Sequence, residues 1–301
     1  MPNLRFGPIH QTDDKNHSHS DMQLYETIAG IRQALDSQRR TGQSIGLVPT
    51  MGALHAGHLA LVDASKTAND LTVCSIFVNP TQFNNPDDLA RYPKTLEADC
   101  KLLEEAGCDL VFAPSVAEMY PSLPVLKLNF GELETVLEGA FRPGHFNGVG
   151  IVVSKLFNIV QPDRAYFGQK DLQQVAVVKR LIRDLGFQLE LVRQPIVRED
   201  DGLAMSSRNR NLSTDERQEA PALYRALVKA QEILRHEGSI ETAKAAVVSY
   251  LENHPAFRLE YFEIANADTL QAVEQLQAPG ATALCIAAHL GKTRLIDNLV
   301  L

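Results

Sequence analysis

A doubly wound parallel α/β sheet, followed by a smaller α+β domain, is the fold class that the sequence predicts. The first observation is an alternation of short apolar strands with amphipathic helices between residues 44 and 192, which is typical of βαβ units. The second is a change after about residue 197, where a polar loop leads into two long helical patterns and then into further strands. We therefore expect a larger domain over residues 22–197 and a smaller one over residues 198–301.

Residues 1–21 precede these patterns and differ from them in composition. They are polar, rich in His, Asp and Asn, and have no hydrophobic period, so we expect a disordered arm. The three histidines of this arm leave metal binding open as an alternative to a solvated tail. Apolar residues at helical spacing begin at Met22 and predict a helix that continues to Leu35.

The remaining elements are predicted in order from their hydrophobic patterns. Strands of the first domain are nearly continuously apolar, as in a sheet covered on both faces, and are expected at residues 44–48, 71–78, 109–113, 125–130, 165–168 and 188–192. Helices between them are expected at residues 57–69, 95–106, 146–160 and 171–185. The second domain is expected to contain helices at residues 214–236 and 240–252 and strands at residues 258–265, 281–288 and 293–299.

The composition of the 301 residues argues against several classes of protein. Lys and Arg number 29 and Asp and Glu number 37, so the net charge of −8 is unlike that of a general nucleic-acid-binding protein, although a local pocket can still bind an anion. No apolar run approaches the roughly 18 residues of a transmembrane helix, and the N-terminus lacks an apolar run of signal-peptide length. Four cysteines, none in a CxxC pair, indicate reduced thiols in a cytoplasmic protein. We therefore expect neither nucleic acid nor a membrane as a partner.

The most informative segment reads PTMGALHAGH over residues 49–58, directly after the first expected strand and at the start of a helix. Gly52 and Gly57 let the backbone approach a ligand closely, and the unpaired N–H groups at a helix N-terminus favour phosphate. His55 and His58, three residues apart, present two imidazole donors to one ligand. The segment therefore predicts a phosphate-binding site.

Other phosphate and metal motifs fit this segment less well. The spacing of Gly52 and Gly57 matches the start of a P-loop, but His58-Leu59 stands where Lys-Ser/Thr is required. No GxGxxG follows a strand, which argues against a dinucleotide site. A zinc site at His55 and His58 would need a third ligand that the sequence does not place. Capping or packing at the helix start stays open for both histidines.

Four motifs in one order resemble a known family. HxGH resembles the HIGH signature of adenylate-forming nucleotidyltransferases, and the longer PTMGALHAGH resembles the pantoate–β-alanine ligase (pantothenate synthetase) family. The segments FVNPTQF at residues 77–83, FGQKDLQQ at residues 167–174 and MSSRN at residues 205–209 agree with that family. The resemblance covers about residues 22–301 and implies a Rossmann-like first domain.

The resemblance implies an ATP-dependent ligase of pantothenate biosynthesis. In such an enzyme the carboxylate of (R)-pantoate attacks the α-phosphorus of ATP, giving pantoyl-adenylate and pyrophosphate. The amine of β-alanine then attacks the acyl carbon, giving pantothenate and AMP. The resemblance also implies Mg²⁺ with ATP, no tightly bound organic cofactor, a cytoplasmic location and a homodimer whose interface the sequence does not reveal.

Site residues follow from the resemblance by position. His55, His58, Lys170 and Arg208 are implied as catalytic, with His58 as the proton donor. Gln82 and Gln174 are implied to bind pantoate, and Gln82 also to neighbour the β-alanine site. The implied ATP-binding residues are Met51, Gly52, Ala53, Leu54, His55, Ala56, Gly57, His58, Gly168, Gln169, Lys170, Asp171, Val197, Met205, Ser206, Ser207 and Arg208.

Several positions stay open. Gln169 stands where the family often has Glu, and Asn211 departs from a commonly aromatic position. Arg142 and His145, in the Gly-rich segment FRPGHFNGVG, suit either a substrate gate or a dimer interface. No metal ligand is assigned; Asp87, Asp88 and Asp99 suit outer contacts to magnesium or helix capping and solvation.

Three alternative functions differ in class from the ligase. One is a nucleotidyltransferase whose product keeps the nucleotide. Another is an RNA-binding module derived from a synthetase, against which the acidic composition argues. The third is a catalytically inactive ATP-binding regulator.

Overall fold

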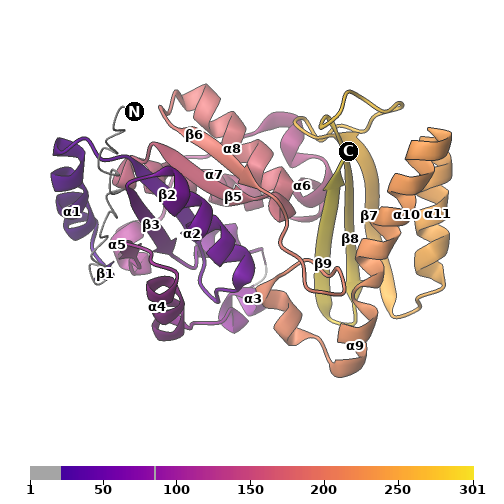
Figure 1. Ribbon diagram of the computed structural model, residues 1–301, viewed down its shortest axis with the longest axis horizontal. Coiled ribbons are helices and arrows are strands. Elements are labelled where there is room, and N and C mark those ends of the chain that lie inside the picture. Colours follow the sequence, from indigo (N-terminus) through magenta and orange to yellow (C-terminus); the bar gives the residue numbers. More distant parts are fainter. Residues whose placement is uncertain (1–21, 85) are drawn as a thin grey trace, which may run out of the picture.

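The computed structural model describes residues 22–84 and 86–301, and the expected arm at residues 1–21 lies outside the described residues. Six parallel strands form one sheet in the order β1-β4-β3-β2-β5-β6, and three antiparallel strands form a second sheet in the order β7-β8-β9 (Figure 1). Helices alternate with the parallel strands along the chain. The predicted fold class, a parallel α/β sheet with a smaller α+β part, is therefore confirmed.

The elements of the parallel sheet and its helices precede those of the second sheet. The strands are β1 (Gln23–Tyr25), β2 (Ile45–Thr50), β3 (Leu71–Ile76), β4 (Leu110–Phe112), β5 (Arg164–Gly168) and β6 (Glu190–Gln194). The α-helices are α1 (Ile28–Arg40), α2 (Ala56–Ala68), α3 (Pro86–Arg91), α4 (Leu96–Glu105), α5 (Val116–Met119), α6 (Leu137–Phe141), α7 (His145–Val160) and α8 (Leu172–Leu185). Short 3₁₀ helices are η1 (Pro80–Gln82), η2 (Gly131–Glu134) and η3 (Gln169–Asp171). The rest of the chain forms η4 (Ser207–Asn211), α9 (Thr214–Glu219), α10 (Ala222–Glu237), α11 (Ile240–Glu252), β7 (Phe257–Asn266), β8 (Thr282–Leu290) and β9 (Thr293–Val300).

Helices cover both faces of the parallel sheet. Leu47 of β2 packs in a core with α1, α7 and α8, whereas its neighbour Val48 packs in a second core with α2 and α4 (Figure 1). Consecutive residues of a strand point to opposite faces, so a strand buried on both faces needs an unbroken apolar run. This explains why the central strands were recognisable in the sequence.

The second sheet makes apolar contacts with helices on one face and with the core of the parallel sheet on the other. Helices α10 and α11 pack on one face of it and form a separate core. On its other face, Ala283 and Cys285 of β8 join the core of the parallel sheet. The two sheets are therefore held together by buried apolar surface as well as by polar contacts.

The order of the parallel strands decides where a ligand can bind. From β2 the chain proceeds to β3 on one side, while β5 lies on the other side of β2. At such a change of direction the connections leave a crevice at the carboxyl ends of the strands. The segments PTMGALHAGH, FVNPTQF and FGQKDLQQ run past the ends of β2, β3 and β5, so all three reach this crevice.

The helix expected over residues 22–35 is wrong over residues 22–27: it begins only at Ile28 and continues to Arg40. Residues Gln23–Tyr25 instead pair in parallel with β4 as an edge strand. The Oγ1 of Thr27 accepts a hydrogen bond from the N–H of Gly30 and caps the helix. Pairing between distant segments thus overrides a local helical pattern.

Two further predictions are wrong. Residues 125–130 form no strand, and Val125 is 96% exposed, so its apolar run does not mark a buried position. The single helix expected at residues 214–236 is divided into α9 and α10. Pro221 lies between them, and its missing N–H and its ring are incompatible with a continuous helix. The other expected elements are present, with ends that shift by no more than two residues.

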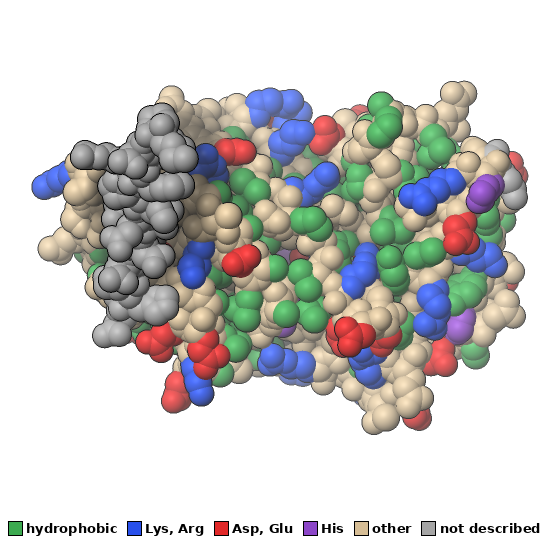
Figure 2. Space-filling view, viewed as in Figure 1, with side chains coloured by type: hydrophobic (Ala, Val, Ile, Leu, Met, Phe, Trp, Pro, Cys, Tyr) green, Lys and Arg blue, Asp and Glu red, His purple; other side chains and the backbone are tan. Residues whose placement is uncertain are grey.

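The surface carries charges of both signs. On the face shown in Figure 2, Lys and Arg side chains are interspersed with Asp and Glu side chains and gather in no basic stripe. Among the described residues, none of the helices has the length and apolar character needed to cross a membrane.

Candidate active site

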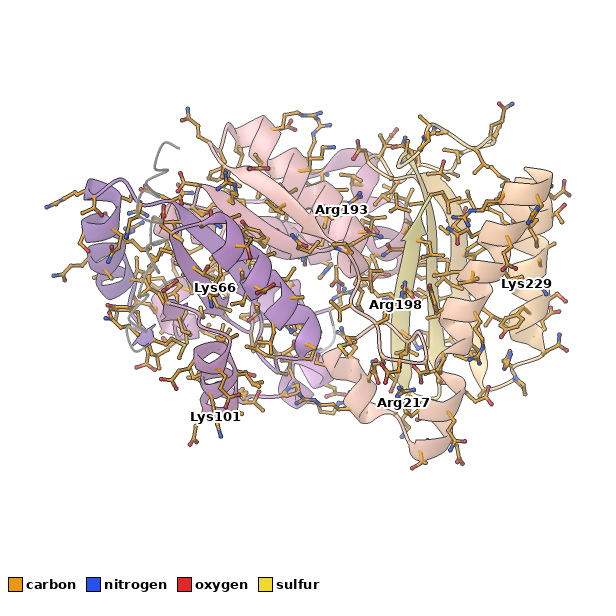
Figure 3. The ribbon with its side chains drawn as sticks, viewed as in Figure 1. Lys66, Lys101, Arg193, Arg198, Arg217 and Lys229 are labelled. Atoms are coloured by element: carbon orange, nitrogen blue, oxygen red, sulfur yellow. The ribbon has the colours of Figure 1, made fainter. Side chains whose placement is uncertain are left out.

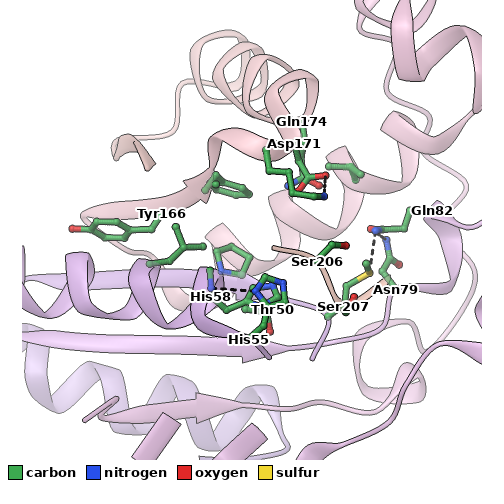
Figure 4. A pocket seen from close by; sticks show the side chains of 18 of the residues that line it. Thr50, His55, His58, Asn79, Gln82, Tyr166, Asp171, Gln174, Ser206 and Ser207 are labelled. Carbon is green, nitrogen blue, oxygen red and sulfur yellow. Dashed lines mark hydrogen bonds and ion pairs between the residues drawn. The ribbon is translucent and has the colours of Figure 1, made fainter. Parts of the chain in front are cut away.

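A cavity lies at the carboxyl ends of β2 and β5 and brings the four motifs together (Figure 4). Of the site residues expected from the sequence, those that line it are Met51, His55, Gly57, His58, Gln82, Gly168, Lys170, Asp171, Gln174, Val197, Met205, Ser206, Ser207 and Arg208. They come from segments up to 157 positions apart in the chain. The fold therefore supplies the proximity that the ordered motifs only suggested.

Five expected ATP-binding residues do not line the cavity: Gly52, Ala53, Leu54, Ala56 and Gln169. The backbone N–H groups of Ala53 and Leu54 donate to the carboxylate of Asp99, at 2.9 and 2.8 Å, and that of Gly52 donates to Thr50 Oγ1 at 3.2 Å. These N–H groups are already bonded within the protein. These bonds fix the shape of the loop.

His55 is the N-cap of α2. Its Nδ1 accepts a hydrogen bond from the N–H of Gly57 at 3.1 Å, so the proton of the neutral ring is on Nε2. Burial, and then the charges of Lys170 and Arg210, lower the pKa of His55 to about 4. At neutral pH His55 therefore offers the cavity an uncharged N–H donor.

His58 lies one turn further along α2, and its ring centroid is 4.1 Å from that of His55. Burial, and then His55 and Lys170, lower the pKa of His58 to about 3, so its ring is also neutral at neutral pH. Its Nδ1 is buried and has no hydrogen-bond partner among the described residues. An unpartnered buried ring nitrogen beside a cavity is suited to a ligand atom.

Lys170 lies on the single turn η3, between β5 and α8. Its side chain is 18% exposed, and its Nζ is 3.8 Å from Asp171 Oδ1. The charge of Lys170 contributes to lowering the pKa of both His55 and His58, and all three side chains line the same cavity. Two neutral donors and one cation thus share this cavity.

Gln82 and Gln174 line the cavity from η1 and α8 (Figure 4). Gln82 is only 8% exposed; its Nε2 lies 3.1 Å from Met51 Sδ, and its Oε1 accepts from Asn79 Nδ2 at 3.1 Å. The neighbouring Gln173 is buried instead in bonds to the backbone of Leu133 and Val136. Of the adjacent pair on α8, only Gln174 lines this cavity.

The segment with Ser206, Ser207 and Arg208 closes another side of the cavity. Ser206 caps η4 by accepting a hydrogen bond from the N–H of Arg208 at 3.2 Å. Arg210, in the same turn, donates to the carbonyl oxygen of Leu54 at 3.2 Å. This contact joins the polar loop to the segment that carries the two histidines.

Arg142 and His145 also line the cavity, which favours a contact with substrate for both. Nδ1 of His145 bonds to the carbonyl oxygen of Gln82 at 2.9 Å, and burial followed by the charge of Arg142 lowers the pKa of His145 to about 4. Through this hydrogen bond His145 supports the backbone of Gln82. Arg142 Nη1 is 3.6 Å from a carboxylate oxygen of Glu138.

Sequence reasoning missed residues that act on other residues of the site. Asn79, 1% exposed, bonds to Gln82 and to the carbonyl oxygen of Gly148, and its Oδ1 accepts from Tyr120. Its signal in the sequence was its place in the FVNPTQF segment, directly after the strand expected at residues 71–78. Arg210 had no comparable signal, because its partner Leu54 lies 156 positions away.

The acidic candidates for magnesium contacts differ in what the structure describes. Asp99 is 2% exposed, and its carboxylate accepts three hydrogen bonds, from Ala53, Leu54 and Thr95, which favours a structural role. Asp87 lies on α3, and the side chain of Asp88 is outside the described residues. Among the described residues, no group of three His, Cys, Asp or Glu side chains is arranged to hold a metal ion.

Comparisons with known proteins agree on what the chain resembles. A family model described as Pantoate-beta-alanine ligase matches residues 23–300. The pantothenate synthetase of Bacteroides thetaiotaomicron is 50% identical over 278 residues, covering 92% of this chain and 98% of that protein.

Solved structures give the same result. The crystal structure of pantothenate synthetase from Thermus thermophilus has a TM-score of 0.88 at 47% identity and covers 93% of this chain and 99% of its own. That of pantoate-β-alanine ligase from Francisella tularensis, complexed with beta-gamma ATP and β-alanine, has a TM-score of 0.73 at 35% identity. It covers 93% of this chain and 97% of its own.

Proposed function

The chain belongs to the pantoate-β-alanine ligase family, and from that premise we propose which of its residues carry out each part of the reaction. The ATP-dependent ligation of pantoate with β-alanine is the activity of this chain. The observation that carries the proposed assignment is the meeting of His55, His58, Lys170 and Arg208 around one cavity. A polyphosphate attacked by a carboxylate needs such a gathering of donors and cations.

In the first step, the pantoate carboxylate attacks the α-phosphorus of ATP and pyrophosphate leaves. Negative charge increases on the phosphate oxygens as this bond forms and breaks. His55 and His58 donate N–H bonds to these oxygens, with His58 as the proton donor, while Lys170 and Arg208 supply positive charge. Ser206 and Ser207 close over the outer phosphates, and the end of the β6 loop at Val197 meets the adenine.

In the second step, the amine of β-alanine attacks the acyl carbon of pantoyl-adenylate and AMP leaves. Gln82 and Gln174 hold pantoate, because an amide offers both a donor and an acceptor. The β-alanine lies beside Gln82, within reach of Arg142, whose guanidinium is suited to a carboxylate. The bond from His145 to the Gln82 backbone supports this placement.

The five expected ATP-binding residues outside the cavity have a different proposed role. Ala53 and Leu54, with Gly52, give the histidine loop its shape through their backbone bonds. Ala56 begins α2, which carries His58. The side chain of Gln169 donates to Asn298 at 3.2 Å and supports the turn of Lys170.

We propose that Mg²⁺ enters with ATP and is held mostly by phosphate oxygens and water. Bound in this way, the ion would neutralise phosphate charge next to Lys170 and Arg208. No tightly bound organic cofactor is needed by the proposed chemistry.

Three further properties are proposed. The enzyme works in the cytoplasm, where the four cysteines, which the structure shows as free thiols, would stay reduced. Its domains divide at residues 197 and 198, so that Arg208 lies in the smaller one. It is a homodimer, and its interface includes the exposed apolar segment of Leu123, Val125 and Leu126.

The experiment that tests the assignment is pantoate-dependent exchange of labelled pyrophosphate into ATP, with Mg²⁺ and without β-alanine. Exchange shows a reversible acyl-adenylate step, and addition of β-alanine should then release free AMP. A product that keeps the nucleotide would favour a nucleotidyltransferase, and RNA affinity in the micromolar range would favour a synthetase-derived module. ATP binding without exchange would favour an inactive regulator.

A further inference from the structure

Strand β9 of the second sheet reaches the turn that carries Lys170. Asn298, on β9, is 2% exposed. Its Nδ2 donates to the carbonyl oxygens of Gln169 and Lys170, at 2.9 and 3.0 Å, and its Oδ1 accepts from Gln169 Nε2 at 3.2 Å. The whole side-chain amide of Asn298 is therefore engaged with one three-residue turn.

That turn has little support of its own. η3 is a single 3₁₀ turn, and such turns have poorer hydrogen-bond geometry than α-helices. The residue before it is Gly168, which provides no side-chain cap and has no Cβ to restrict the backbone. Asn298 adds a side-chain donor to two carbonyl groups of the turn. The orientation of Lys170 thus depends on a residue 128 positions away.

The opposite face of β9 contacts the chain segment that follows β6. Asp297, 4% exposed, forms a paired contact with the guanidinium of Arg198, at 2.7 and 2.9 Å. Arg198, beside β9 in Figure 3, also stacks on Tyr224 and bonds to the carbonyl oxygen of Gly202. Arg198 begins the loop that leads to Ser206–Arg208. One strand is therefore joined both to the Lys170 turn and to the base of that loop.

We propose that Asn298 is a positioning residue for Lys170, through which the second sheet sets the direction of the Lys170 ammonium group. This inference rests on the proposed role of Lys170 at the phosphates. Asn298 does not line the main cavity; it acts on the backbone of the turn. A displacement of about 1 Å at a reacting centre typically costs about a hundredfold in rate, so loss of these bonds should be visible in catalysis.

The test is a double-mutant cycle that combines Asn298→Ala with Lys170→Ala. We expect Asn298→Ala alone to lower kcat of pantoate-dependent pyrophosphate exchange about 10- to 100-fold. In the Lys170→Ala background, the same change should have little further effect, since there is no longer an ammonium group to position. The four proteins are also titrated with ATP, because binding stays measurable where turnover is slow.

Arg294→Gln is the matched control for looser contact between the two sheets. Arg294 lies on the same face of β9 as Asn298. Its guanidinium bonds to Glu138 of α6, at 2.7 and 2.8 Å, and does not touch the Lys170 turn. Its effect, if any, should be the same in both backgrounds. Asn298→Asp enters the same cycle as a second variant that keeps the side-chain shape but removes both N–H donors.

The outcomes distinguish a failure of the positioning role of Asn298 from a failure of the proposed role of Lys170. Equal losses from Asn298→Ala with and without Lys170, or no loss at all, would overturn the positioning role. An unchanged response of Lys170→Ala to ATP and pantoate would instead overturn the proposed role of Lys170. Coupling between Asn298 and Lys170, absent between Arg294 and Lys170, supports the inference.

Discussion

Asp99 accepts a hydrogen bond from the backbone N–H of Ala53 at 2.9 Å and thereby stabilises a residue in the left-handed region, with φ of 52°. This conformation is unfavourable for any residue with a Cβ, by roughly 1–2 kcal/mol. A second bond, from the N–H of Leu54, fixes the next peptide as well. The strained backbone lies two residues before His55, so the carboxylate on α4 determines how the histidine loop leaves β2.

We expect Asp99→Asn to lower the exchange rate at least about tenfold. The Asn amide keeps the shape of Asp99 but has one acceptor oxygen, whereas the carboxylate offers two oxygens to its three donors. The amide also adds buried N–H groups, and each one without a partner costs about 1–3 kcal/mol. Exchange kinetics and urea denaturation measure the two effects. Thr95→Val is the matched control, because it removes only the side-chain donor to Asp99 and leaves both backbone bonds in place. A rate for Asp99→Asn equal to that of the control would contradict the role of Asp99.

His58→Ala should fold normally and lose at least about 100-fold in the exchange rate. The neutral ring donates to charge that is greatest in the transition state, and removal of one such donor typically costs about 3 kcal/mol. Circular dichroism checks the fold, and exchange kinetics give the rate. His236→Ala, at an exposed position near the end of α10, is the matched control. A near-wild-type rate for His58→Ala would remove this residue from the mechanism.

The buried His145 makes the stability of the protein depend on pH. Its pKa in the folded state is lowered to about 4, whereas an unfolded histidine has a pKa of about 6.5. Between these values the unfolded chain binds a proton that the folded chain does not, so the free energy of unfolding falls as the pH is lowered from about 6.5 to 4. This loss is at most about 1.4 kcal/mol per pH unit for one group.

His145→Asn should make that slope shallower. The Asn amide can still donate to the carbonyl oxygen of Gln82, as Nδ1 of His145 does, but it does not titrate. Urea denaturation at several pH values between 4 and 7 gives the slopes for both proteins. The same slope in the variant and the wild type would show that His145 takes up no extra proton on unfolding.

The sequence predicted the parts of the site that depend on local signals. A strand, two glycines and two histidines within residues 45–58 were enough to predict the strand–loop–helix unit that the structure shows. Pairs such as Asp99 with Ala53, or Asn298 with Lys170, left no such signal, because 46 and 128 positions separate their members. Spacing along the chain reveals neighbours on one helix, but not contacts made across the fold.

Adjacent residues show the same limit at close range. Gln173 and Gln174 have the same chemistry, and only the family resemblance singled out Gln174 in the sequence; in the structure, the rotation of α8 about its axis separates the buried side chain from the one at the cavity. The edge strand β1 was read as helix, because its three residues form a strand only through pairing with β4. A strand that forms only by pairing with a distant segment is therefore the hardest element to predict from local sequence patterns.

The proposed dimer gives a prediction about the segment at residues 123–126. Leu123, Val125 and Leu126 are 80, 96 and 63% exposed, an unusual concentration of large apolar side chains in water. In a two-fold dimer the same patch of each copy meets the other, so one substitution alters the interface twice. Val125→Asp should therefore shift the protein from dimer to monomer, as measured by light scattering after size-exclusion chromatography. Val248→Asp, at a position on α11 that is 43% exposed, makes the same substitution elsewhere and should leave the dimer intact. A monomeric wild-type protein, or a Val125→Asp variant that stays dimeric at the same concentration, would contradict this interface.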